Sequence, residues 1–233
     1  MTQSETQWKS PLATLPGAVA LEDVEGDVAF DVTAHYGDHS GEQWALEAGR
    51  AITDRPDLAV VEVSGPDRLT WLTSISSQVL TGIAPGESRE LLIMNPQGHI
   101  EHACGALDDG EILYLITEAS DAQALADWLN SMRFALRVEI TISQRWWLLG
   151  SIGDSGVSQC DQVTLTWNDP WPGVVDGGAA YYQRKHPGES LAFHIHLVPR
   201  DQAREFWRAW SEAAPKRRAA GMTAWEATRI AAW

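Results

Sequence analysis

The amino-acid sequence predicts an α+β fold built on antiparallel sheets. Between residues 57 and 149 a buried strand leads into a helix, and a run of strands, a second helix and further strands follow. The triplet Asp108-Asp109-Gly110 is a strong hairpin turn between two of these strands. Parallel neighbours require crossovers of about a dozen residues or more, and the short connections here leave little room for them. The order is typical of a split α+β pattern.

The composition argues against several classes of protein. At 233 residues the chain can hold one large domain or two of ordinary size. The formal net charge of −15 argues against a broad nucleic-acid surface, and the basic cluster Lys216-Arg217-Arg218 is better explained as a solvated linker than as a nucleic-acid contact. No apolar run reaches the roughly 18 to 20 residues of a membrane span, and the first residues lack a signal-peptide pattern. We therefore expect a cytoplasmic protein without membrane contact.

Cysteine usage is sparse, with Cys104 and Cys160 alone. Two cysteines without a C-x-x-C pair argue against a disulfide framework, a metal site or iron–sulfur ligation by this chain. Cys104 lies within an apolar strand pattern, where a buried inert thiol is favoured over a thiolate nucleophile. No metal is expected.

The N-terminal part begins with a polar and then acidic segment, residues 1–30, which predicts a loose arm with one short strand at 18–21. Ser40 is expected to cap a helix that extends to Arg50. The preceding His35-Tyr36-Gly37-Asp38-His39 suggests a metal site, but a polar turn explains it better, because no further ligand is suitably spaced.

The central part carries the clearest strand and helix signals. A β-branched run at 60–63 predicts a buried strand that stops at Ser64-Gly65-Pro66, and Leu69, Leu72 and Ile75 then form the apolar face of a helix with Asp67 at its positive end. Residues 91–94 predict a second strand, followed by a turn at 95–98 and a third strand. A helix opened by Ser120 carries apolar residues at helical spacing, and strands at 137–142 and 145–150 follow.

The C-terminal part contains a long stretch rich in glycine and proline, residues 151–188, in which we expect only the strands 163–167 and 180–183. Its segment Asn168-Asp169-Pro170-Trp171 is a candidate for lining a site, although a plain surface loop is the simpler interpretation. Residues 191–198 form an alternating strand with His194 and His196 on one face. A half-exposed sheet face explains this pair better than zinc or copper binding. Helices opened by Asp201 and Met222 end the chain.

Four motifs in order support a family resemblance: V-S-G-P-D-R-L-T-W-L-T-S-I-S-S-Q, M-N-P-Q-G-H-I, D-W-L-N-S-M-R-F and G-M-T-A-W-E-A-T-R-I-A-A. Over roughly residues 36–232 the chain resembles the YgfZ-type folate-binding proteins, relatives of the aminomethyltransferase (T-protein) of the glycine cleavage system. The resemblance implies ferredoxin-like units around a central hole that receives tetrahydrofolate or a one-carbon derivative, and a C-terminal β-barrel domain.

The resemblance also implies how the chain is divided. Residues 31–145 would form the first α+β unit of the folate-binding domain, and residues 146–233 the second, truncated at its C-terminal helix. In the family the signature K-G-C-Y-x-G-Q-E lies beyond that helix, and this chain ends before it. We therefore expect an N-terminal fragment from which the β-barrel is absent.

Seven folate contacts are carried over by the resemblance. They lie on the strand before the turn, at the turn, after it, in the glycine-rich stretch and on the last helix: Glu90, Leu92, Asn95, Glu101, His102, Trp171 and Arg229. Trp171 would stack on a ring of the folate, and Arg229 would meet a glutamyl carboxylate. His102-Ala103 stands where T-proteins carry an aspartate pair, which argues against genuine aminomethyl transfer.

Three functions follow from these observations. The leading hypothesis is a tetrahydrofolate-binding accessory protein that supports iron–sulfur protein assembly or repair, with iron–sulfur client or assembly proteins as partners. The alternative is a folate-dependent aminomethyltransferase or demethylase that recruits Glu90 or Glu101 as general base. A third hypothesis is an interaction module whose acidic face docks a basic partner.

Overall fold

The structure of this protein is a computed structural model, which describes residues 8–21, 31–171, 173, 184 and 191–232. The strands are β1 (Val19–Ala20), β2 (Thr33–His35), β3 (Ala51–Asp54), β4 (Leu58–Ser64), β5 (Ser88–Met94), β6 (Ile100–Asp108), β7 (Ile112–Glu118), β8 (Glu139–Ser143), β9 (Trp146–Ile152), β10 (Leu165–Asn168), β11 (Phe193–Pro199) and β12 (Arg218–Ala220). The α-helices are α1 (His39–Glu47), α2 (Arg68–Ile75), α3 (Ala122–Met132), α4 (Ala203–Glu212) and α5 (Met222–Ala231).

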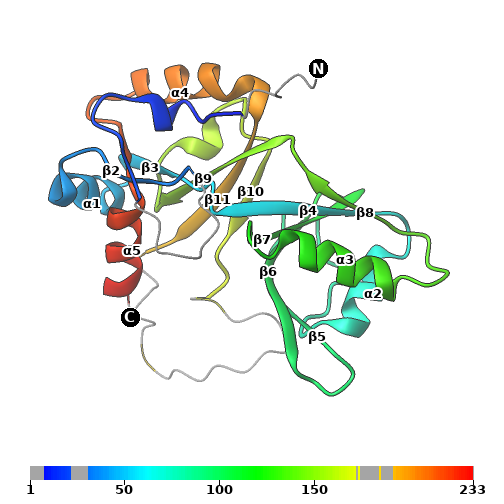
Figure 1. The fold of residues 1–233 in the computed structure, drawn as a ribbon. Coiled ribbons are helices and arrows are strands. Elements are labelled where there is room, and N and C mark those ends of the chain that lie inside the picture. The colour runs from blue at the N-terminus through cyan, green and yellow to red at the C-terminus, as the bar shows by residue number, and fades with distance from the viewer. Residues whose placement is uncertain (1–7, 22–30, 172, 174–183, 185–190, 233) are drawn as a thin grey trace, which may run out of the picture.

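Two five-stranded sheets organise the molecule (Figure 1). The first has the strand order β5-β6-β7-β4-β8, and all of its neighbours are antiparallel. The second has the order β10-β11-β9-β3-β12, in which β3 and β12 are parallel and the other pairs antiparallel. The predicted α+β fold with antiparallel sheets is confirmed.

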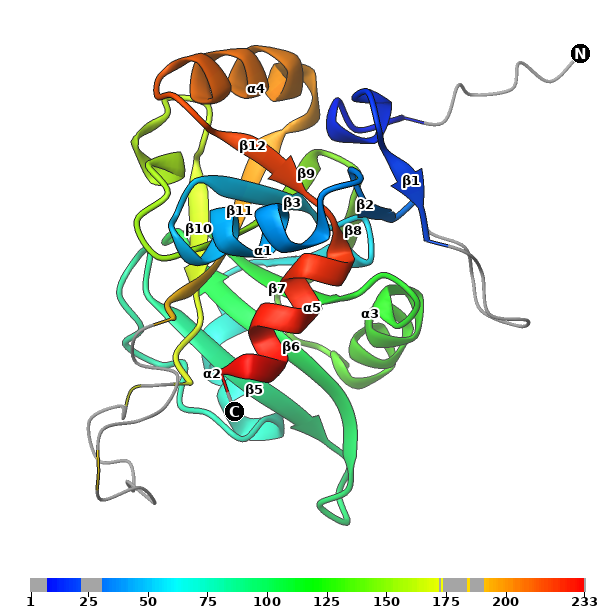
Figure 2. The same cartoon turned by 90° about the vertical axis from the view of Figure 1, so that its left-hand side faces the viewer.

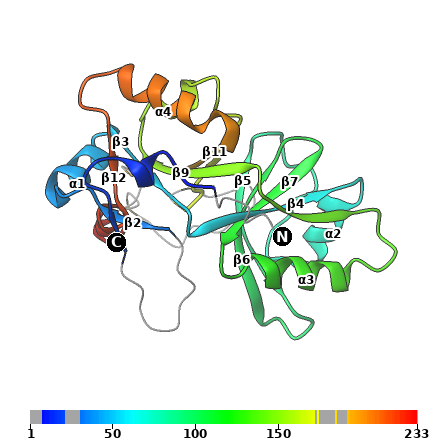
Figure 3. The same cartoon turned by 45° about the horizontal axis from the view of Figure 1, so that its top comes forward.

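Helices cover the outer faces of both sheets. The helices α2 and α3 pack on the first sheet, and α4 packs on the second with the N-terminal segment (Figure 3). A third apolar cluster lies between the sheets and includes residues of β4, β7, β9, β11, α1 and α5. The helices α1 and α5 lie together with β12 on the side that faces the viewer in Figure 2.

The predicted apolar face of α3 is confirmed, but the start of α1 differs from expectation. In α3 Leu125 and Leu129 are fully buried, as their spacing predicts. Helix α1 is capped by Asp38 rather than Ser40, because the Asp38 carboxylate accepts a hydrogen bond from the Gly41 N–H at 3.2 Å. Asp67 lies at the N-terminus of α2, as expected, but its side chain makes no capping bond and pairs with Arg137 at 2.7 Å.

The expected division of the chain does not follow the sheets. The strand β3 lies before residue 145 but pairs with β9 and β12, so the second sheet draws on both expected units. Part of the expected loose arm is packed, because Leu12 is fully buried in the same apolar cluster as Trp147. The strand predicted at 180–183 lies outside the described residues. Within the described residues, no helix is long and apolar enough to cross a membrane.

Candidate functional site

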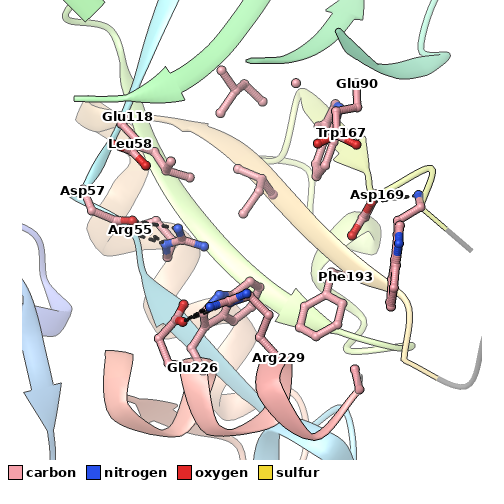
Figure 4. A pocket seen from close by; sticks show the side chains of 16 residues that line it. Arg55, Asp57, Leu58, Glu90, Glu118, Trp167, Asp169, Phe193, Glu226 and Arg229 are labelled. Atoms are coloured by element: carbon pink, nitrogen blue, oxygen red, sulfur yellow. Dashed lines mark hydrogen bonds and ion pairs between the residues drawn. The ribbon is translucent and has the colours of Figure 1, made fainter. Parts of the chain in front are cut away.

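A cavity of about 640 Å³ opens between the two sheets and beside α5. Its walls come from β5, β6, β7, β10 and β11, from the turn before β4, and from the exposed turns of α5 (Figure 4). The volume lies within the range of roughly 300 to 1,000 Å³ that is typical of small-molecule sites.

The first wall is a row of residues across the first sheet. Glu90 pairs with Gly105, and Gly105 pairs with Ile116, so the three residues face the same side of β5, β6 and β7. All three line the cavity. The register of the antiparallel sheet thereby places the Glu90 carboxylate in one row with Gly105 and Ile116.

Gly105 provides the seat for Trp167. A Cβ on residue 105 would lie 2.8 Å from Cε2 of the Trp167 indole, which is closer than real contacts allow. The indole Nε1 donates to the carbonyl oxygen of Arg89 at 2.8 Å, so β10 of the second sheet is tied to β5 of the first. Gly105 therefore leaves space for the Trp167 ring, which lines the cavity together with Glu90.

The second wall repeats this arrangement on the other sheet. A Cβ on Gly150 of β9 would lie 2.5 Å from Cζ3 of Trp225 on α5. The Trp225 ring meets Phe193 edge-to-face, with centroids 5.3 Å apart and an interplanar angle of 74°. Rigid aromatic surface thus borders the cavity on both sheets.

Two arginines line the cavity, and both are paired. Arg55 donates to both carboxylate oxygens of Asp57, from Nε at 2.9 Å and 3.2 Å and from Nη2 at 2.6 Å. Its guanidinium lies 5.0 Å from the Trp225 ring centroid. Arg229 donates to Glu226 one turn earlier on α5, at 2.7 Å. Figure 4 shows the first pair on one side of the cavity and the second below it.

The lining of the cavity contains more carboxylates than arginines. Five carboxylates, those of Asp57, Glu90, Glu118, Asp169 and Glu226, line it together with the two arginines. Partial burial, and secondarily the charge of Asp169, raises the pKa of Glu90 above its usual value. The cavity therefore suits a ligand that presents N–H donors or positive charge to the Glu90 side.

Of the seven contacts predicted from sequence, the structure brings three together in the cavity: Glu90, Trp171 and Arg229. Leu92 lies two residues beyond Glu90 on β5 but does not line the cavity. Asn95 and Glu101 bond to each other at 2.6 Å at the β5–β6 turn.

His102 lies on the other face of the first sheet. It is buried there, with Nδ1 2.7 Å from the Asp121 carboxylate and its ring beside Trp128. The side chains of β6 alternate between the two faces, so His102 points away from the cavity that Gly105 lines.

Sequence reasoning missed most of the other cavity residues. Trp225 and Glu226 belong to the G-M-T-A-W-E-A-T-R-I-A-A motif. The motif predicted the helix but did not indicate which of its residues face the cavity. Arg55 and Asp57 flank a proline turn that carries no recognisable motif. Asp169 and Trp171, in contrast, belong to the loop segment that was a candidate for lining a site.

The histidines and cysteines do not form a metal centre in the described part of the chain, where no group of three suitable ligands occurs. The imidazole of His196 is buried between the hydroxyls of Ser151 at 2.8 Å and Thr166 at 2.9 Å, and burial lowers its pKa to about 3. Burial raises the pKa of the Cys104 thiol to about 12. This thiol stays protonated, in agreement with the expected inert cysteine.

Comparisons with known proteins place the fold. No protein-family model and no curated protein matches the sequence. Among solved structures, the crystal structure of glycine cleavage system aminomethyltransferase T from Bartonella henselae matches with a TM-score of 0.64 and 16% identity. The match covers 92% of this chain and 58% of that chain. This chain therefore has an α+β fold like that of aminomethyltransferase T, and it spans 58% of that protein's length.

Proposed function

We propose that this chain binds a reduced folate, tetrahydrofolate or a one-carbon derivative, in the cavity between its two sheets. One observation carries the proposal: Glu90 and the Trp167 ring, which packs against Gly105, line the same cavity in a fold like that of an aminomethyltransferase. When bound, tetrahydrofolate supplies the nitrogens N5 and N10, which carry a one-carbon unit.

The chemistry of a folate matches the residues that line the cavity. A pterin ring presents adjacent N–H donors, which one carboxylate can accept in pairs, and Glu90 offers such a carboxylate. The flat rings suit Trp167 and Trp171. The glutamate tail carries carboxylates, for which Arg229 is a partner once it turns from Glu226.

The four sequence motifs that resemble the YgfZ-type proteins support an extension of this proposal. We propose that the chain has an accessory role in iron–sulfur protein assembly or repair, in which iron–sulfur proteins are the partners. Activity of iron–sulfur enzymes in cells that lack this protein, with and without a restored copy carrying Glu90→Gln, tests that role. Unchanged iron–sulfur enzyme activity in the deleted cells would remove it.

Calorimetry tests the binding itself. Tetrahydrofolate and 5-formyltetrahydrofolate are titrated into the wild-type chain, into Glu90→Gln and into the matched control Glu101→Gln. Loss of one charge-assisted pair is expected to weaken binding about tenfold or more in Glu90→Gln. The control should bind like the wild type, because Glu101 bonds to Asn95 outside the cavity. Absence of saturable binding to the wild type would refute the proposal.

A second function is favoured by the raised pKa of Glu90. A carboxyl that keeps its proton to higher pH is better matched to general acid–base work on a folate nitrogen. The chain would then be a folate-dependent aminomethyltransferase or demethylase. Aminomethyl-lipoyl protein and tetrahydrofolate, incubated with the chain, would give methylenetetrahydrofolate, ammonia and dihydrolipoyl protein, whose sulfur becomes a thiol when its bond to the methylene carbon breaks. Folate binding without either product, and without turnover of sarcosine or dimethylglycine, would leave the accessory role.

A further inference from the structure

A second cavity, of about 440 Å³, lies between α1 and the chain that enters β12. It is lined by the small residues Gly41 and Ala45 on α1 and by four basic residues, Arg50, Lys216, Arg217 and Arg218. We infer that this basic cavity is a binding site for a phosphate-bearing small molecule, separate from the cavity between the sheets.

The first argument is the concentration of positive charge. The chain has 32 acidic and 17 basic residues, yet the lining of this cavity contains no carboxylate. Arg218 is paired with Asp38 at 2.7 Å. Among the described residues, Arg50 and Lys216 form no ion pair, and Arg217 contacts a carbonyl and a ring instead of a carboxylate. Arg50 and Lys216 therefore keep their charge available to an anion, and the charge of Arg217, which no carboxylate neutralises, adds to the positive potential of the cavity.

The second argument is the fixed position of Arg217. Its guanidinium donates to the carbonyl oxygen of Trp210 at 2.9 Å and lies 5.0 Å from the centroid of the Trp210 ring. It also passes so close to the backbone of Gly156 that a Cβ there would collide with it. These contacts hold the charge of Arg217 in a fixed position next to Lys216 and Arg218, where it contributes to the positive potential of the cavity without first losing side-chain freedom.

The third argument is the parallel pairing of β3 and β12. The N–H of Arg218 donates to the carbonyl oxygen of Arg50 at 3.0 Å, which brings residues 168 positions apart side by side. Lys216 takes a left-handed conformation, with φ of 67°, where the chain turns from α4 into β12. The basic cluster is therefore gathered around one cavity together with Arg50, whereas the sequence suggested a solvated linker.

These features favour a small phosphate over a nucleic acid. Several guanidinium and ammonium donors around one cavity match the oxygens of a doubly charged phosphoryl group. The volume exceeds that of a single phosphate group and leaves space for a molecule that carries one. A long polyanion would meet the net charge of −15 beyond these few cations.

Pyrophosphate is the probe for the test. It is titrated by calorimetry at low ionic strength into the wild-type chain, into the double variant Arg50→Gln/Lys216→Asn and into the control Arg204→Gln, an exposed arginine of α4 outside the cavity. Asparagine tolerates the left-handed conformation at 216. Saturable wild-type binding that weakens about tenfold or more in the double variant but not in the control supports the site.

Two outcomes would overturn the inference. The first is absence of saturable pyrophosphate binding to the wild type, or equal weakening in the control variant. The second comes from a single-stranded oligonucleotide tested in parallel: binding of the oligonucleotide in preference to pyrophosphate, with the same loss in the double variant, would assign the cavity to nucleic acid.

Discussion

The carboxylate of Glu42 on α1 accepts a hydrogen bond from the backbone N–H of Gly221, at 2.9 Å and across 179 positions of the chain. Its other oxygen accepts from the backbone N–H groups of Tyr36 and Asp38, and the residue is completely buried. Gly221 directly precedes α5, the helix that brings Trp225, Glu226 and Arg229 to the cavity between the sheets.

Replacing Glu42 with glutamine should therefore affect both stability and the cavity. The amide retains one accepting oxygen but turns an N–H group toward backbone donors, which should cost about 1 to 3 kcal/mol in the free energy of unfolding. Urea unfolding measures this loss, and calorimetry with tetrahydrofolate measures any displacement of α5. The exposed Glu47→Gln is the control, because its amide oxygen can still accept the hydrogen bond from Gln43 and its N–H group faces water. Equal stability of the two variants would contradict the role of Glu42.

Because the Trp167 ring packs directly against Gly105, we expect the variant Gly105→Ala to be overpacked. The added methyl would collide with the indole, so we expect a loss of about 1 to 3 kcal/mol in unfolding free energy. In a Trp167→Ala background the same methyl meets no ring, so Gly105→Ala should then be nearly neutral. A double-mutant cycle by urea unfolding tests this dependence. Additive effects of the two substitutions would show that the contact is not responsible.

Asp54 predicts a pH-dependent contribution to stability. Burial raises its pKa to about 6, although its carboxylate accepts a hydrogen bond from the Trp147 indole at 2.9 Å. The folded state holds this proton more tightly than the unfolded state. The contribution to stability is therefore fully present below the unfolded pKa of about 4 and is lost as the pH rises through about 6.

The variant Asp54→Asn should remove that loss, which is on the order of 3 kcal/mol for a shift of this size. Unfolding free energies of the variant and the wild type are compared between about pH 4 and pH 7. His196 titrates in the opposite sense, because its lowered pKa favours the folded state as the pH rises. Both proteins contain His196, so the difference between them isolates Asp54, and parallel pH profiles would refute the assignment.

The buried pair of Arg68 and Asp108 links α2 to the end of β6. Two hydrogen bonds join them, at 2.9 Å and 3.0 Å, and both side chains are nearly inaccessible to solvent. Arg68→Met leaves the Asp108 carboxylate buried without its cation and should cost about 3 to 5 kcal/mol.

An exposed pair provides the comparison for Arg68→Met. Arg137 contacts Asp67 with similar geometry at the surface, where water solvates both charges, so Arg137→Met should have little effect on unfolding. The double variant Arg68→Met/Asp108→Asn should recover part of the loss, since no unpaired charge stays buried. Urea unfolding of the three variants tests this order, and equal losses for Arg68→Met and Arg137→Met would contradict it.

The sequence alone determined the local elements. The β-branched run before Ser64 predicts β4, the Asp108-Asp109-Gly110 turn predicts the β6–β7 hairpin, and the spacing of Leu125 and Leu129 predicts the buried face of α3. These signals depend on residues a few positions apart, which is the range over which backbone conformation and one-sided burial leave a pattern. The family resemblance pointed to a folate, and it named three residues that line the cavity, Glu90, Trp171 and Arg229.

Only the tertiary structure decided which of these residues meet. The partners at the cavity are far apart in sequence: Gly105 with Trp167, Gly150 with Trp225, and Arg50 with Arg218 at the basic cavity. The same strand that carries Glu101 turns His102 toward Asp121, because alternate residues of β6 face opposite sides of the sheet. The pairing of β3 with both β9 and β12 and the docking of α5 arise from contacts between segments that are far apart in the chain, and local sequence patterns do not encode such contacts.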